Sequence, residues 1–199
     1  MKTISVLFLS FLIMNFAFAQ SAEINAKAPN FTLKDSNGKE HSLSDFEGKT
    51  VVLEWINYDC PFVKKHYDSG NMQSLQEKYT QKGVIWLAIC SSAKGKQGHF
   101  SNDEINKRSK EHNAKFTAYL VDEDGKVGKM YGAKTTPHMY IINSKGNLVY
   151  AGAIDDIKST DKDDIKKAKN YVAKALDEVL SDKEVTTKST TPYGCSVKY

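Results

Sequence analysis

A cysteine followed by a proline is the residue pair of this sequence best placed to do chemistry. Cys60 and Pro61 come directly after residues 51–56, an apolar run rich in β-branched and aromatic side chains that predicts a buried strand. Proline is preferred at the first position of a helix, so Cys60 is expected at the helix N-cap. Unpaired backbone N–H groups and the helix dipole both favour the thiolate form of a cysteine there. The pair therefore predicts thiol chemistry with Cys60 as the nucleophile.

Two further cysteines, Cys90 and Cys195, give an odd total, so at least one thiol stays outside any intramolecular disulfide. Three pairings are open. Cys90 ends an apolar strand run and is expected to fill the core, although the same position would also allow it to lie near Cys60. Cys195 follows a polar tail and is a candidate second redox thiol. The alternative for Cys60 itself is an inert, buried, small apolar residue, as most cysteines are.

The elements that must position Cys60 alternate between strands and helices. Residues 51–56 and 84–90 read as buried strands joined by helical segments, which predicts a parallel βαβ unit with a right-handed crossover. Residues 117–121 predict a third strand. Active groups in such sheets gather at the carboxyl ends of the strands, and Cys60 follows one of these ends.

Hairpins flank this unit. An Asn-Gly turn signal predicts one within residues 30–41, and residues 138–142 and 147–151 predict another at the sheet edge. Pro137 stands at a strand start and is a candidate cis peptide, although prolyl bonds are mostly trans. Apolar residues at helical spacing predict one long helix over residues 165–179. Together these elements predict an α/β fold with a central mixed β-sheet flanked by helices and an N-terminal β-hairpin extension.

Residues 1–19 predict a secretory signal peptide. Lys2 supplies the positive start, an apolar core follows, and an Ala-Phe-Ala cleavage pattern ends the segment. The apolar core is short for a membrane span, so a retained anchor is the less favoured alternative. We expect cleavage near Ala19 and export to the periplasm or the extracellular space, where disulfides persist, with no membrane contact afterwards.

Length and composition predict one domain over residues 20–199, of which residues 181–199 form a polar tail ending in a cysteine motif. The net charge of +4 comes from lysines spread along the chain, and Arg108 is the only arginine. Nucleic-acid-binding proteins cluster their positive charge and use arginine, so this pattern argues against nucleic acid as a partner. Zinc, phosphate-loop and serine-triad signatures are missing, and we expect no metal and no cofactor.

Four short segments of the sequence, called here the four sequence words, together resemble one family. They stand where the peroxiredoxin-like branch of the redoxin family, of the alkyl hydroperoxide reductase/thiol-specific antioxidant type, carries similar segments. They read CPFVKKH, YGAKTTPHMYII, LVYAGAIDD and GCSVKY. The resemblance covers nearly all of the mature chain and implies a thioredoxin-like fold. It implies that Cys60 is the attacking cysteine and that Thr136 and Pro137 form the cis-proline loop, where the Thr136 backbone pairs with an extended peptide.

The sequence departs from that family at functional positions. Disulfide reductases of the superfamily carry a second cysteine three residues after the first, where this chain has Val63. Peroxiredoxins carry a proline and a threonine ahead of the cysteine, where this chain has Leu53 and Asn57, and an arginine from elsewhere. The arginine available here, Arg108, is predicted in a marginal, exposed helix. The usual peroxide-polarising donors are therefore not in place by motif, although Asn57 could substitute as a donor.

We predict an exported thiol oxidoreductase in which Cys60 attacks a peroxide or a disulfide, giving a sulfenic acid or a mixed disulfide. Cys195 is the candidate resolving thiol, with Cys90 second. The partners implied are a thiol reductant or a protein disulfide, with peroxide as a further substrate. The expected substrate-binding residues are Asn57, Tyr58, Pro61, Thr136 and Pro137.

Two other classes of function stay open. A catalytically silent redoxin would bind a partner protein through the groove beside Pro137, and an unactivated Cys60 thiol would favour it. A metal chaperone would use thiolate and imidazole ligands. No other cysteine stands close to Cys60 in the sequence, however. His66 comes six residues after Cys60, which places the two side chains on different faces of the helix, so the metal chaperone is disfavoured.

Overall fold

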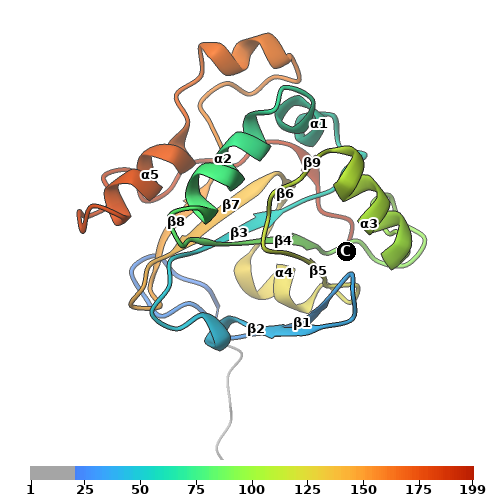
Figure 1. The fold of residues 1–199 in the computed structure, drawn as a ribbon, viewed down its shortest axis with the longest axis horizontal. Coiled ribbons are helices and arrows are strands. Elements are labelled where there is room, and N and C mark those ends of the chain that lie inside the picture. The colour runs from blue at the N-terminus through green and yellow to red at the C-terminus, as the bar shows by residue number, and fades with distance from the viewer. Residues whose placement is uncertain (1–20) are drawn as a thin grey trace, which may run out of the picture.

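Alternating helices and strands make up residues 21–199, the part of the chain described by the computed structural model (Figure 1). The signal peptide predicted over residues 1–19 lies outside this part. The elements are β1 (Thr32–Asp35), β2 (Glu40–Ser42), η1 (Leu43–Phe46), β3 (Val51–Trp55), α1 (Pro61–Asp68), α2 (Asn71–Thr80), β4 (Ile85–Cys90), α3 (Asn102–Glu111), β5 (Ala118–Val121), α4 (Lys126–Tyr131), β6 (Thr135–Thr136), β7 (His138–Ile142), β8 (Leu148–Gly152), η2 (Lys162–Lys166), α5 (Tyr171–Val179) and β9 (Cys195–Ser196). From residue 21 onward, none of these helices has the length and apolar character to span a membrane.

Seven strands form one mixed sheet in the order β2-β1-β5-β4-β3-β7-β8. The neighbours β3, β4 and β5 run parallel, with Val51 opposite Ile85 and Leu87 opposite Ala118. The other neighbouring pairs are antiparallel, so the hairpins β1–β2 and β7–β8 form the two edges. This confirms the predicted mixed sheet and its N-terminal hairpin. β6 and β9 pair in a separate two-stranded sheet.

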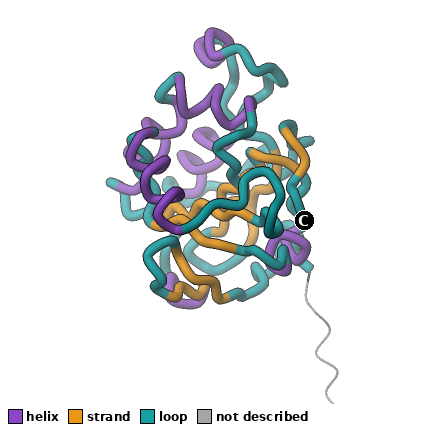
Figure 2. Tube along the Cα trace, turned by 90° about the vertical axis from the view of Figure 1, so that its right-hand side faces the viewer, coloured by secondary structure: helices purple, strands orange, loops and turns teal. Residues whose placement is uncertain are grey.

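The central strand β3 supplies both apolar layers because its side chains alternate between the two faces of the sheet. Val52 packs in one layer with Trp86 and with Leu176 of α5. Leu53 and Trp55 pack in the other layer, on the side of α4. In the view turned by 90° the strands cross the middle of the molecule, and most of the helical chain lies on one side (Figure 2). The sheet therefore holds β3, and the end of β3 that leads to Cys60, between two packed layers.

The single long helix predicted over residues 165–179 is wrong. The chain forms the 3-10 turn η2 and then a separate α5, which begins after Asn170. The Asn170 side chain accepts a hydrogen bond from Ala173 N at 2.8 Å, and the Asp156 carboxylate accepts one from Lys169 N at 2.7 Å. The Asn170 side chain satisfies a backbone donor in the first turn of α5, and the Asp156 carboxylate satisfies one just before the helix. The apolar spacing before Asn170 therefore does not continue α5.

The polar segment over residues 181–199 packs against the rest of the chain. Val185 and Tyr193 are buried. Ala151 N, in β8, donates to Lys188 O at 3.0 Å, so the segment runs beside the edge of the sheet. It then reaches β6 and forms β9 (Figure 1).

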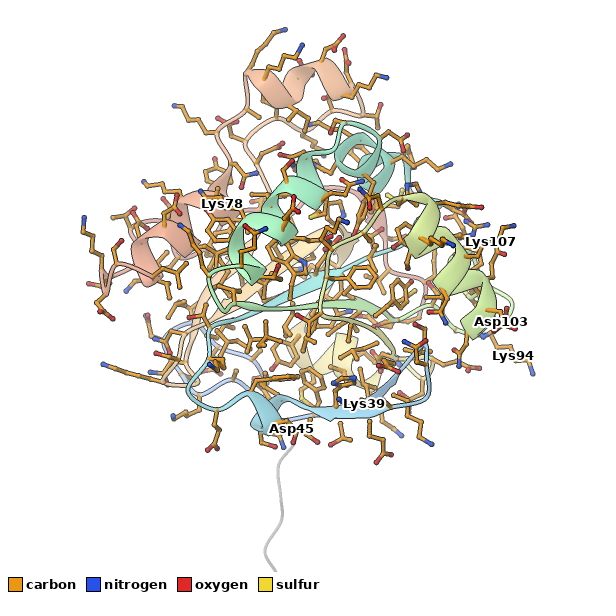
Figure 3. The ribbon with its side chains drawn as sticks, in the orientation of Figure 1. Lys39, Asp45, Lys78, Lys94, Asp103 and Lys107 are labelled. Carbon is orange, nitrogen blue, oxygen red and sulfur yellow. The ribbon has the colours of Figure 1, made fainter. Side chains whose placement is uncertain are left out.

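Charged side chains lie around the outside of this frame. Lys78 projects from α2, and Asp103 and Lys107 project from α3 (Figure 3). Lys107 Nζ lies 4.0 Å from carboxylate oxygens of both Glu104 and Glu111. Such exposed ion pairs contribute little to stability, so the positioning of Cys60 rests on the packed layers.

Candidate functional site

Cys60 stands where the chain passes from β3 into α1. Cys60 is the N-cap of α1, and Pro61, which is exposed, is the first residue of the helix, as predicted. The Cys60 side chain has no exposed surface, and its Sγ donates a hydrogen bond to the backbone oxygen of Thr136 at 3.0 Å. The predicted nucleophile therefore lies at the amino end of a helix and against the loop that precedes β7.

The loop before β7 brings the C-terminal cysteine to the same place. The peptide bond between Thr136 and Pro137 is cis, the rarer of the two states considered from the sequence. Thr136 belongs to β6, and its partner across the antiparallel pairing with β9 is Cys195. Cys60, Thr136 and Cys195 thus meet at one site although they are far apart in the sequence.

Cys195 differs from Cys60 in exposure and has a perturbed acidity of its own. The Cys195 side chain is partly exposed. Burial, and after it the hydrogen bond and charge of the neighbouring Cys60, raise the pKa of Cys195 to about 11. A cysteine with that pKa is a thiol at neutral pH, and the thiolate is the reactive form.

Cys90 is buried at the end of β4 and fills the core, as the sequence favoured. Its Sγ lies 3.4 Å from both Ser92 Oγ and Gly98 O. Desolvation raises the pKa of Cys90. All three cysteines are free thiols. The Cys90 sulfur thus contacts Ser92 and Gly98, whereas Cys195 has Cys60 as its neighbour.

The side chains of Asn57 and Tyr58, two predicted substrate-binding residues, stabilise the loop before Cys60 through contacts inside the protein. Asn57 Oδ1 accepts a hydrogen bond from Asp59 N at 2.9 Å, and Asn57 Nδ2 donates to Gln97 O at 3.3 Å. The Tyr58 ring is buried and stacks on His112 with 4.8 Å between ring centroids. In this conformation both side chains are engaged inside the protein.

Arg108 reaches the loop that carries Cys60, even though α3 is largely exposed. Its Nη1 donates to Asp59 Oδ1 at 2.8 Å and its Nε donates to Glu104 Oε1 at 2.7 Å. The guanidinium carbon lies 3.9 Å from the centre of the Phe100 ring. Two carboxylates and one ring therefore fix this cation beside the residue that precedes Cys60, a position that helix periodicity did not reveal.

A buried polar cluster that was not predicted connects α1 with the C-terminal segment. It consists of Lys65 and His66 from α1, Asp155 from the loop after β8, and Tyr193 from the C-terminal segment. Lys65 Nζ lies 3.6 Å from Asp155 Oδ2, and the Tyr193 hydroxyl donates to Asp155 Oδ1. Burial, and then the charge of Lys65, lower the pKa of His66 to about 3, so its imidazole is neutral. The cluster ties the helix that begins at Cys60 to the segment that carries the second cysteine.

Lys65, His66 and Asp155 of this cluster lie in the four sequence words, as do Thr136 and Cys195 of the site around Cys60. CPFVKKH supplies Lys65 and His66, LVYAGAIDD supplies Asp155, YGAKTTPHMYII supplies Thr136, and GCSVKY supplies Cys195. All four words converge on one site in the structure. Periodicity within one segment cannot reveal this, because it reports only which face of that segment is buried.

A second buried polar group lies in β3. Glu54 Oε2 accepts hydrogen bonds from Trp86 Nε1 at 2.7 Å and from Gln76 Nε2 at 3.1 Å, and Oε1 accepts one from the Tyr67 hydroxyl at 3.0 Å. Complete burial raises the pKa of Glu54 to about 7, although each of these three hydrogen bonds opposes the rise. Glu54 therefore titrates in the neutral range.

Within residues 21–199, no group of three or more His, Cys, Asp or Glu side chains is placed to hold a metal ion. The pair considered for metal transfer is separated in its contacts. Cys60 contacts Thr136, whereas His66 faces Asp155 and Tyr193. Cys60 and His66 therefore do not face one common ligand position in this structure.

Comparisons with known proteins agree with this geometry. A family model described as Redoxin matches residues 23–170. The chain is 28% identical over 134 residues to the thiol-disulfide oxidoreductase ResA of Bacillus cereus, covering 67% of this chain and 72% of that protein. It is 33% identical over 130 residues to the chloroplastic peroxiredoxin Q of Triticum aestivum, covering 61% of this chain and 55% of that protein. The crystal structure of an uncharacterized conserved protein from Geobacillus kaustophilus aligns with a TM-score of 0.75 and 29% identity, over 89% of this chain and 92% of that one.

Proposed function

The chain belongs to the redoxin family, and from that membership we propose an exported thiol oxidoreductase in which Cys60 attacks a disulfide or a peroxide and Cys195 resolves the product. Thiol oxidoreductase activity is supported by its similarity to a thiol-disulfide oxidoreductase and to a peroxiredoxin. The assignment of the two cysteines is ours. It rests on their placement at one site rather than on similarity.

The observation that carries the assignment is the antiparallel pairing that sets Cys195 opposite Thr136, whose oxygen accepts the Cys60 hydrogen bond. A disulfide substrate loses one thiolate as Cys60 forms a mixed disulfide with it. A hydroperoxide loses an alcohol, or water, as Cys60 becomes a sulfenic acid. In either case Cys195 then attacks the Cys60 sulfur, and the second thiol, or water, leaves. An external dithiol returns the protein disulfide to two thiols and is itself oxidised.

Two finer parts of the proposal have different support. The similarity to peroxiredoxin Q supports hydroperoxide as a substrate. The composition of residues 1–19 supports export to a compartment where thiols and disulfides exchange outside the cytoplasm. Of the predicted substrate-binding residues, Pro61 is exposed beside Cys60, whereas Thr136 and Pro137 are buried.

A catalytically silent binding protein is the weaker interpretation. It would use the backbone of Thr136 to hold a partner, and this backbone is already paired with Cys195. A silent protein also gives no reason for two free thiols at one site.

The test is peptide mapping by mass spectrometry after the reduced mature protein is treated with one equivalent of hydrogen peroxide or of glutathione disulfide. We expect a disulfide between Cys60 and Cys195, and no such product from Cys60→Ser. A Cys60 that remains a free thiol with both oxidants contradicts the proposal. A disulfide that involves Cys90 instead contradicts the assignment of Cys195.

A further inference from the structure

Residues 193–199 are called here the C-terminal strap, and the backbone of Thr135 and Thr136 is called the β6 edge. The strap pairs with this edge through Cys195 and Ser196. Figure 1 shows β9 beside β6, near the start of α1. The pairing continues past β9, because Val197 N donates to Lys134 O at 3.1 Å. The strap thus takes the place of an added strand at the edge where an extended polypeptide would pair.

One end of the strap is anchored in the buried cluster. The Tyr193 hydroxyl donates to Asp155 and lies 3.4 Å from His66 Nε2. Asn71 Nδ2 donates to His66 Nδ1 at 2.9 Å, so the imidazole proton sits on Nε2 and points toward this hydroxyl. The Tyr193 ring packs edge-on against Phe62 of α1 with 5.8 Å between centroids. Tyr193 therefore fixes the strap to the helix that begins at Cys60.

The other end is held by backbone and by a close approach to a glycine. Ala93 N donates to Lys198 O at 2.8 Å, and the Tyr199 hydroxyl donates to Ala133 O at 2.7 Å. A Cβ at Gly128 would lie 2.6 Å from the Tyr199 hydroxyl, so the missing side chain at Gly128 lets the Tyr199 ring approach α4 closely. The strap is consequently fixed on both sides of Cys195.

The strap limits access to the Cys60 sulfur more for an extended polypeptide than for a small molecule. Cys60 has no exposed surface, whereas its neighbour Cys195 keeps some. A small molecule needs only a local opening beside Cys195 to reach the Cys60 sulfur. An extended polypeptide needs the β6 edge itself, and the strap must leave the whole edge before the polypeptide can pair there.

On the premise of the proposed function, we propose that the strap sets the substrate class, directing Cys60 to small disulfides and hydroperoxides and excluding disulfides held in extended polypeptides. Tyr193 is the positioning residue that keeps the strap in place. For a small disulfide RSSR the reaction consumes two protein thiols, forms the Cys60–Cys195 disulfide and releases two RSH. No further reactant is needed for this half of the cycle.

The test uses two substrates with the same leaving group, thionitrobenzoate, joined by a disulfide either to cysteamine or to a cysteine within an unstructured peptide. The mature protein releases thionitrobenzoate from the cysteamine substrate faster than from the peptide. Tyr193→Phe removes only the hydroxyl, and Tyr193→Ala also removes the ring. We expect the ratio of peptide rate to cysteamine rate to rise about tenfold in Tyr193→Phe, the effect of losing one hydrogen bond to a charged group, and further in Tyr193→Ala.

Tyr79→Phe is the matched control, because this buried tyrosine of α2 also bonds a carboxylate, that of Asp177, at 3.0 Å. Its ratio should equal that of the wild type. Hydrogen exchange over residues 193–199 reports release of the strap directly. Equal wild-type rates for the two substrates overturn the inference, as does a ratio that stays fixed in both Tyr193 variants. The proposed function fails separately, if neither substrate reacts with the wild-type protein.

Discussion

Cys195 lies directly opposite Thr136 in the register of β9 and β6, and the backbone oxygen of the same Thr136 accepts the hydrogen bond from Cys60. One peptide unit therefore contacts both cysteines. Val63 stands three residues after Cys60, where a Cys-x-x-Cys pattern has its second cysteine, so the second thiol beside Cys60 comes from the pairing of β9 with β6 instead of from α1.

Cys60 and Cys195 should act in successive steps, Cys60 in the reaction with the oxidant and Cys195 in closing the intramolecular disulfide. In Cys195→Ser, Cys60 still reacts with one equivalent of oxidant, but the mixed disulfide or sulfenic acid is not closed to an intramolecular disulfide. We expect the first step to keep its rate within about threefold, because Cys60 and α1 are unchanged, and steady-state turnover to be lost. Rapid mixing with substrate, followed by acid quench and mass analysis, separates the two steps.

Cys90→Ser is the control for that experiment, because Cys90 is buried, hydrogen-bonded to Ser92 and of raised pKa. Its turnover should match that of the wild type. Unimpaired turnover in Cys195→Ser, with loss of turnover in Cys90→Ser, would reverse the assignment of the resolving thiol.

The acidity of Cys195 should depend on Cys60. The pKa of Cys195 is raised to about 11 by burial and by the adjacent Cys60, so the part due to Cys60 disappears when Cys60 becomes serine. We expect the pH at which Cys195 becomes half-reactive toward iodoacetamide to fall in Cys60→Ser. In the proposed cycle the oxidation of Cys60 removes the same neighbouring thiol, which would make Cys195 more reactive in the step that follows. An unchanged or higher midpoint in the variant contradicts this coupling.

Much of the frame that positions Cys60 could be predicted from local patterns. The strand before Cys60 is continuous and apolar, and Pro61 marks the first residue of α1, so the N-cap position followed from two adjacent residues. The Asn-Gly turn likewise predicted the β1–β2 hairpin. Each of these depends on contacts close in sequence or on the burial of one face, which composition and spacing report.

The contacts that complete the site could not be predicted in this way. No helix or strand period covers Asp155 or Tyr193, and only the fold places these two residues against His66. The long helix was wrong for a related reason, since the Asn170 side chain caps α5 at a point that the apolar spacing passes over. Pairings between distant segments depend on tertiary structure, and only the joint occurrence of the four sequence words indicated one.

Glu54 should make stability depend on pH. Its pKa is about 7 in the folded protein, whereas 4.5 is the ordinary value of an exposed glutamate, so the folded state binds more protons between these values. The free energy of unfolding therefore falls as the pH rises through this window, by about 3 kcal/mol in total at about 1.4 kcal/mol for each pKa unit. Urea unfolding near pH 5 and near pH 8 measures the fall.

Glu54→Gln separates this contribution from those of other groups. A glutamine keeps one oxygen as acceptor for Trp86 and Gln76 and does not titrate. The difference in unfolding free energy between pH 5 and pH 8 should shrink by about 2.5 kcal/mol relative to the wild type, slightly less than the full shift because an unfolded carboxyl of pKa 4.5 is already mostly ionised at pH 5. Parallel pH dependences in the two proteins would mean that Glu54 does not take up a proton on folding.

Gly194→Ala should loosen the segment that carries Cys195. Gly194 has φ +147°, a conformation that L-residues rarely adopt, and a Cβ there would collide with Thr136 O. Relief of that collision requires β9 to move away from β6, at a cost of about 1–3 kcal/mol if it stays paired. We expect Cys60, which is fully buried in the wild type, to be alkylated about tenfold faster in the variant.

Gly38→Ala is the matched control, since Gly38 has φ +83° with no atom within 4 Å of an added Cβ, and strain alone at that turn should leave Cys60 alkylation unchanged. Equal alkylation of Cys60 in Gly194→Ala and the wild type would show that the pairing of β9 with β6 does not control access to the nucleophile.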